Sequence, residues 1–308
     1  MGAFELNGKV ALITGASYGL GEVFAHRMAD IGADLVLTAR SAEMLEGVAS
    51  AIRAKGRKVT VAAGDVSVED DVRRVVAAGV KDHGKIDILV NNAGISDMRG
   101  LTSENYDTET FNRIFAVDAL GVFLYAREVG RHMLERRSGS IVNICSIMGS
   151  GANELNVIAY TAAKGAVRNL TQQLGCEWAD RGVRVNAVSP GFIATEMTRA
   201  AIEGLGMADY IASRTPMRRI GDADEVANAV IFLASDASSY ITGHDLLVDG
   251  GTNASNGTFQ VRPGHFDWGA MIGKPVIPGG YEGMVPLPER FSLWAAGIPG
   301  VHYELPAG

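Results

Sequence analysis

Two side chains at helical spacing are the first candidates for chemistry in this sequence. Tyr160 and Lys164 lie four residues apart in a helix-periodic stretch, so both project from one face, about one turn apart. An ammonium group beside a phenol favours the phenolate, so this pair could accept and return a proton. Ser146 directly follows a predicted strand and could bring a hydroxyl to the same place. The alternative is an amphipathic helix with a buried ring and a solvated lysine.

A glycine-rich turn near the N-terminus is a candidate phosphate site. The predicted strand at 9–14 runs into the string TGASYGLG, and a helix-periodic stretch follows. Glycines let backbone N–H groups approach a pyrophosphate, and the helix N-terminus adds partial positive charge. This string lies at the first strand-to-helix junction, which favours dinucleotide binding over a turn that needs glycines only for close packing. We predict cofactor contacts at Gly15, Ser17, Tyr18, Gly19, Leu20 and Gly21.

The elements that must position these residues alternate along the chain. Short β-branched runs predict strands at 9–14, 34–38, 58–62, 85–90, 139–145, 183–189 and 245–249. Helical periodicity predicts helices at 19–31, 41–55, 68–82, 108–136, 157–180 and 223–235. This alternation is typical of an α/β fold, so we predict a doubly wound, seven-stranded parallel sheet in three α/β/α layers. The segment 192–218, interrupted by glycine and proline, is predicted to be a mobile insertion.

The end of the second strand bears on cofactor choice. NAD enzymes usually place an acid there to hold the ribose hydroxyl, whereas arginine accommodates the 2′-phosphate of NADP. Here Arg40 follows Ala39, and no acid occurs from Val36 to Ser41. We predict NADP, with NAD possible; the alternative for Arg40 is a solvated surface side chain.

Two further strand ends are expected at the same edge of the sheet. Ligands of parallel sheets lie beyond the carboxyl ends of the strands. We therefore expect the adenosine half of the cofactor beside Asp65 and Val66, and beside Asn92, Ala93 and Gly94. Turn chemistry alone would also explain these residues.

Taken together, these motifs resemble the short-chain dehydrogenase/reductase family in its single-domain form. The shared features are TGxxxGxG, NNAG, a serine ahead of YxxxK, and the later string PGFIAT, over roughly residues 6–252. The resemblance implies a Rossmann-type fold and an NADP-dependent oxidoreductase that interconverts a ketone and a secondary alcohol. It also implies a homo-oligomer, a dimer or tetramer.

The resemblance assigns roles to individual residues. Tyr160 would be the general acid and base, and Ser146 would hydrogen-bond the same substrate oxygen. Tyr160 and Lys164 would also contact the cofactor. Further cofactor contacts are implied at Pro190, Gly191, Ile193 and Thr195.

The sequence departs from the family pattern at Asp118. Family members usually have an asparagine there, in the fourth helix, that completes a proton relay. The carboxylate either takes part in catalysis or only caps or kinks the helix. In addition, Ser146 and Tyr160 are separated by one residue more than is commonest in the family, which implies a slightly longer substrate loop.

Three other functions stay open. The strings TGASYG and NICSIM are similar to those of gluconate 5-dehydrogenases, which suggests an NAD-dependent polyol or sugar-acid dehydrogenase. A non-enzymatic cofactor-sensing protein could use the same fold, although it would not need the acid–base residues. A dehydratase or epimerase could use the same base.

Composition narrows the partners to small molecules. The net charge is -7, without a basic stripe, which argues against nucleic acid. No apolar run is long enough for a membrane span, and no histidines pair at metal-ligand spacing, so neither membrane nor metal is expected. Two cysteines make no disulfide framework, and a cytoplasmic location is expected.

The composition changes after Thr252. Prolines, glycines and aromatic residues are concentrated in the remaining stretch, which predicts a loop-rich extension rather than a helix. We therefore expect a catalytic domain at 1–252 and a C-terminal extension at 253–308 that covers a substrate entrance. The alternatives are a disordered tail, or a tail that only stabilises the fold.

Overall fold

The computed structural model describes residues 2–255, except 98, 152–155, 196, 197, 199–201 and 203–206. Seven parallel strands form one sheet in the order β3-β2-β1-β4-β5-β6-β7. They are β1 (Val10–Thr14), β2 (Asp34–Thr38), β3 (Val59–Val61), β4 (Ile88–Asn91), β5 (Gly139–Ile144), β6 (Val183–Pro190) and β7 (Asp245–Val248). The strand order reverses at β1, and doubly wound sheets bind ligands beside such a switch point. The predicted sheet is confirmed.

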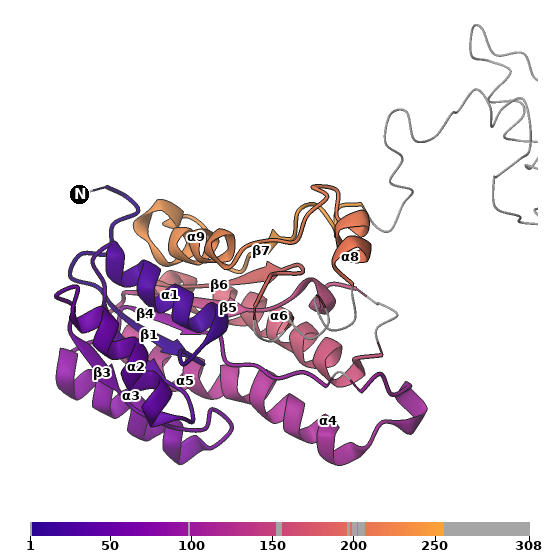
Figure 1. Cartoon of the computed structure of the whole chain (residues 1–308). Coiled ribbons are helices and arrows are strands. Elements are labelled where there is room, and N and C mark those ends of the chain that lie inside the picture. Colours follow the sequence, from indigo (N-terminus) through magenta and orange to yellow (C-terminus); the bar gives the residue numbers. More distant parts are fainter. Residues whose placement is uncertain are drawn as a thin grey trace, which may run out of the picture. The chain divides into compact units, whose positions relative to one another are not determined.

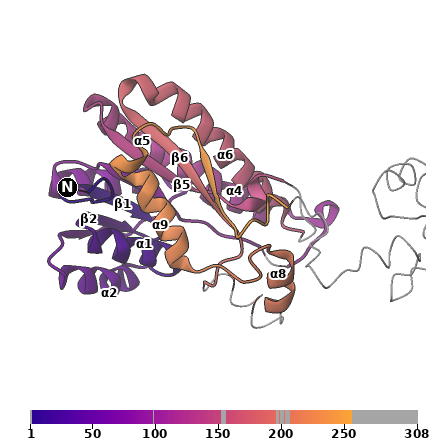
Figure 2. The same cartoon turned by 90° about the horizontal axis from the view of Figure 1, so that it is seen from above.

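Helices cover both faces of this sheet (Figures 1 and 2). One face packs against α1 (Gly19–Asp30), α2 (Ala42–Arg53) and α9 (Ala223–Ala234). The other packs against α3 (Glu69–His83), α5 (Gly121–Glu135) and α6 (Ile158–Trp178). The three predicted layers are therefore present.

Strand β1 shows how one strand supplies both layers. All five of its residues are buried. Ala11 and Ile13 join the core with α1, α2 and α9, whereas Val10 and Leu12 join the core on the opposite face. Successive side chains of a strand point to opposite faces, so a sheet covered on both sides needs a nearly continuous apolar run.

The predicted helix at 108–136 is not continuous. It consists of α4 (Thr108–Phe115), a π-helical turn (Ala116–Leu120) and α5. A π turn is wider than an α-helical turn because its hydrogen bonds span five residues, and such turns are frequent at functional sites. Asp118 lies in the middle of this one. The segment 192–218 also contains a helix, α8 (Ala208–Arg214), so it is not irregular throughout.

A buried chain of amides ties the sheet to α6. The Asn91 side chain donates to the amide oxygen of Asn143 at 2.9 Å, and the Asn143 amide donates to the Thr171 hydroxyl at 2.9 Å. The hydroxyl in turn donates to Val167 O at 2.8 Å. Because all three side chains are at most 2% exposed, each needs its partner. This network fixes the helix that carries Tyr160 and Lys164.

Replacing Thr171 with valine is expected to lower the free energy of unfolding by about 1–3 kcal/mol. The variant keeps the volume but leaves a buried Asn143 N–H without an acceptor. Denaturant titration measures the change. Thr171→Ser, which keeps the hydroxyl, is the control and should lose less; equal losses would contradict the role of the hydroxyl.

The remaining predictions concern the C-terminal extension, membrane-spanning helices and metal sites. Apart from residues 253–255, the predicted C-terminal extension lies outside the described residues. No helix in the described part is long and apolar enough to cross a membrane. Within the same residues, no group of three or more His, Cys, Asp or Glu side chains could hold a metal ion.

Candidate active site

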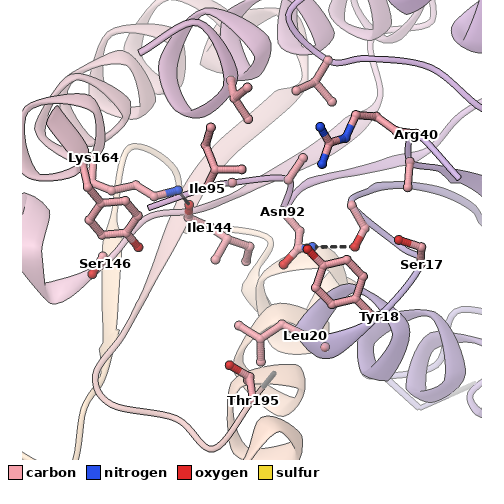
Figure 3. Close-up of a pocket in the computed structure, with 18 of the residues that line it drawn as sticks. Ser17, Tyr18, Leu20, Arg40, Asn92, Ile95, Ile144, Ser146, Lys164 and Thr195 are labelled. Carbon is pink, nitrogen blue, oxygen red and sulfur yellow. Dashed lines mark hydrogen bonds between the residues drawn. The ribbon is translucent and has the colours of Figure 1, made fainter. Parts of the chain in front are cut away.

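A cavity of about 470 Å³ opens at the carboxyl ends of the strands, beside the switch point of the sheet (Figure 3). It gathers nearly all of the predicted site residues from distant parts of the chain. Those lining it are Gly15, Ser17, Tyr18, Gly19, Leu20, Arg40, Asp65, Val66, Asn92, Ala93, Gly94, Ser146, Tyr160, Lys164, Pro190, Gly191, Ile193 and Thr195. Gly21 and Asp118 are not part of the lining and lie just behind it.

The glycine loop is shaped by close backbone approaches. Gly15 and Gly19 have φ of +64° and +63°, a region that side-chain-bearing residues rarely adopt. A Cβ atom on Gly21 would lie 2.1 Å from Gly15 O, so only glycine fits there. Gly21 therefore has a packing role, and the loop can fold tightly onto the N-terminus of α1.

Hydrogen bonds tie the glycine loop to the end of β4. The Asn92 side chain donates to Thr14 O at 3.0 Å and to Gly15 O at 3.1 Å. The Thr14 hydroxyl accepts from the backbone N–H groups of Asn92 and Ala93, at 2.9 and 3.0 Å. The two strand ends on either side of the switch point are thus held at a fixed separation.

Ser146 and Lys164 meet at one end of the cavity (Figure 3), and Tyr160 lines the same end beside Lys164. Ser146 follows β5, and its hydroxyl accepts from Met148 N at 3.1 Å and is near enough to Tyr160 to lower the pKa of the phenol. Lys164 Nζ lies 5.4 Å from the centre of the Tyr160 ring and donates to Ile144 O at 3.1 Å. The phenol, the hydroxyl and the ammonium are therefore neighbours, as the spacing predicts.

Burial and neighbouring charges shift the pKa values of Tyr160 and Lys164 in opposite directions. Burial raises the pKa of Tyr160 above its usual value, while the Lys164 charge and the nearby Ser146 hydroxyl work against that rise. Burial alone would lower the pKa of Lys164, but the Asp118 carboxylate and Tyr160 outweigh it, so the lysine pKa is raised. Lys164 therefore stays cationic although it is only 3% exposed.

Asp118 contacts the cluster from behind. Its Oδ2 lies 3.2 Å from Lys164 Nζ, and its Oδ1 accepts from Ile95 N at 2.8 Å. Burial raises the pKa of this carboxyl, and Lys164 opposes the rise. The side chain does not cap a helix.

Two arginines line the cavity without a carboxylate partner among the described residues. Arg40 follows β2, as predicted, and lies far from Ser146 and Lys164 (Figure 3). Arg113, on α4, was not predicted from the sequence. Its only sequence signal is its place one helical turn before Val117, which also lines the cavity.

Comparison with known proteins places this geometry in a family. A family model described as enoyl-(acyl carrier protein) reductase matches residues 15–253, more than half of the chain. The chain belongs to the short-chain dehydrogenase/reductase family. Membership makes it an alcohol oxidoreductase that uses NAD(P), as the sequence motifs predict, rather than a non-enzymatic sensor.

Three relatives illustrate the range of this family. The chain is 40% identical over 252 residues to gluconate 5-dehydrogenase of Gluconobacter oxydans (strain 621H), covering 82% of this chain and 97% of that protein. It is 40% identical over 251 residues to galactitol 2-dehydrogenase (L-tagatose-forming) of Cereibacter sphaeroides, covering 80% and 96%. A gluconate 5-dehydrogenase from Burkholderia cenocepacia J2315, solved with NADP and tartrate, superposes with a TM-score of 0.78 at 38% identity, covering 82% and 98%.

Proposed function

We propose that this enzyme interconverts a ketone and a secondary alcohol with NADP(H), using Tyr160 as general acid and base. One observation carries the proposal: a single cavity holds Ser146 and Lys164 at one end and Arg40 at the other (Figure 3), with Tyr160 beside Lys164. The first three residues supply acid–base chemistry, and Arg40 supplies a charge for the 2′-phosphate that distinguishes NADP from NAD.

The residues present fit such a cofactor. The tight turn at Gly15 and the N-terminus of α1 offer N–H groups to a diphosphate. Arg40 is exposed and makes no ion pair within the described residues, so its charge is available to an anion. NADP(H), when bound, supplies or accepts the hydride. The relative from Burkholderia cenocepacia was solved with NADP, which supports this choice.

The protein's own contribution is proton transfer and charge stabilisation. In reduction, Tyr160 Oη gives its proton to the substrate carbonyl oxygen, and Ser146 donates a hydrogen bond to that oxygen as its negative charge grows. The cationic Lys164 then stabilises the phenolate that remains. In oxidation the phenolate takes the hydroxyl proton, and the same contacts act in reverse.

Polyhydroxylated compounds are the proposed substrates. Two of the relatives named above act on gluconate and one acts on galactitol. A sugar acid differs from a neutral polyol in its carboxylate, so the cations near the site bear on the choice between them.

One observation on the loop after β4 bears on the choice between a sugar acid and a neutral polyol. Arg99 is held by two carboxylates: its Nε lies 2.8 Å from Asp97 Oδ2, and a terminal nitrogen lies 2.8 Å from Asp107 Oδ2. Lys164 is likewise paired with Asp118. Within the described residues these two cations are neutralised, so a substrate carboxylate would have to pair with Arg113, the arginine of α4 that lines the cavity without a carboxylate partner.

A spectrophotometric screen of the purified enzyme tests this function. Oxidation of NADPH and NADH is followed with 5-ketogluconate, L-tagatose and cyclohexanone, and reduction of NADP and NAD with gluconate and galactitol. We expect NADPH to be preferred, and a polyhydroxylated ketone to exceed cyclohexanone in kcat/KM. A preference for NADH would overturn the cofactor assignment, and no turnover of any pair would overturn the reaction.

A further inference from the structure

Asp118 is a fully buried carboxylate inside an otherwise apolar contact between helices. Around it, Ile114 and Ala119 pack against Ala159 and Ala163 of α6. Asp118 is 0% exposed and lies on the π-helical turn between α4 and α5. Burying a charge without a partner is very unfavourable, so this carboxylate requires one.

Its two oxygens have two different partners. Oδ1 accepts the backbone N–H of Ile95 at 2.8 Å, which fixes the carboxylate to the loop after β4. Oδ2 faces Lys164 Nζ at 3.2 Å. A Cβ atom on Gly94 would lie 3.0 Å from Oδ2 and 3.4 Å from Nζ, so the pair is covered closely by backbone. The ammonium cannot move far without leaving the carboxylate unpaired.

Lys164 is therefore held between two fixed acceptors, the Asp118 carboxylate and the Ile144 carbonyl oxygen. The other titratable groups near the pair are few in the described residues. Tyr160 lies on α6, as Lys164 does, and Cys145 lies at the end of β5. Tyr106 packs against the apolar cluster that contains Ile114 and Ala163. The loop after β4 contributes backbone N–H, and the facing side of α4 is apolar.

We propose that Asp118 is a positioning residue that holds Lys164 in place and, by offsetting its charge, sets the pH at which Tyr160 exchanges its proton. This inference rests on the proposed role of Tyr160. An ammonium paired with a carboxylate stabilises a nearby phenolate less than an unpaired one, because the opposite charge subtracts from its field. The enzyme then needs a higher pH for alcohol oxidation than it would with a neutral residue at 118.

The direction of the expected change in the Tyr160 pKa follows from the charges around the phenol. Lys164 lowers the pKa of Tyr160, and the Asp118 carboxylate, a like charge to the phenolate, raises it. Removing the carboxylate should therefore lower the tyrosine pKa. Alcohol oxidation requires the phenolate, so its rate rises with pH through this pKa, and that rise should move to lower pH.

The test compares Asp118→Asn with the wild-type enzyme. The rising limb of kcat/KM for alcohol oxidation is expected about 1 pH unit lower in the variant. Asp70→Asn, which removes an exposed charge on α3, is the matched control and should leave the limb in place. A limb that stays where it is, or moves to higher pH, would overturn the proposal.

A second measurement does not depend on turnover. Carbon-13 NMR of tyrosine labelled at Cζ, with the Tyr160 signal assigned by its loss in Tyr160→Phe, reports ionisation of the phenol directly. We expect the Tyr160 titration to shift down in Asp118→Asn, and also in the smaller Asp118→Ser if the first variant does not fold. An unchanged titration overturns the role of Asp118, whereas a shifted titration in a protein that turns over no alcohol would overturn only the proposed function.

Discussion

Tyr160→Phe is expected to lower kcat by about 10²–10⁴-fold while leaving the Kd for the cofactor nearly unchanged. The substitution deletes the proton donor but keeps the ring, so the shape of the cavity is retained. Neither Ser146 nor Lys164 can replace the phenol. A serine hydroxyl is too weak an acid, and Lys164 is held by Asp118 and Ile144 O.

Steady-state kinetics and cofactor titration by fluorescence separate the two effects. Tyr240→Phe is the matched control, because the Tyr240 side chain is fully exposed and does not line the cavity. Its kcat should equal that of the wild type. If Tyr160→Phe keeps most of its activity, Tyr160 is not the general acid and base.

The cluster of Ser146, Tyr160 and Lys164 was predictable because short stretches of sequence determine where its residues lie. Tyr160 and Lys164 are one helical turn apart, so their proximity follows from the helix alone. Ser146 follows a strand that neighbours β4 and β6, and the parallel order places its end at the cavity. The glycine loop was predictable for the same reason, since one strand, one turn and one helix define it.

What the sequence did not predict depends on tertiary packing. Periodicity cannot reveal the π turn at 116–120, because one widened turn barely disturbs the pattern of apolar residues on either side. The exposed face of α4 that lines the cavity, including Arg113, is set by how that helix docks. The ion pair of Asp118 with Lys164 likewise joins residues 46 positions apart, through packing that no local motif encodes.

Arg40→Asp is expected to shift the NADP-to-NAD ratio of kcat/KM toward NAD by about 100-fold or more. A charge-assisted hydrogen bond contributes about 1.5–3 kcal/mol, which is roughly 10- to 150-fold in binding. The introduced carboxylate would also repel the 2′-phosphate and could accept a hydrogen bond from the ribose hydroxyl of NAD. Both changes act in the same direction.

The side chain of Arg40 suits this test because its removal should not disturb the fold. It is exposed and has no ion-pair partner in the described part of the chain, so protein stability should change little. Arg131→Asp on α5 makes the same charge change at a side chain that is 58% exposed and outside the cavity, and should leave the ratio unaltered. If the wild type already prefers NAD, or if both variants shift alike, Arg40 is not the determinant. The second arginine, Arg113, would then be the cation to replace next, since it too lines the cavity with its charge unpaired among the described residues.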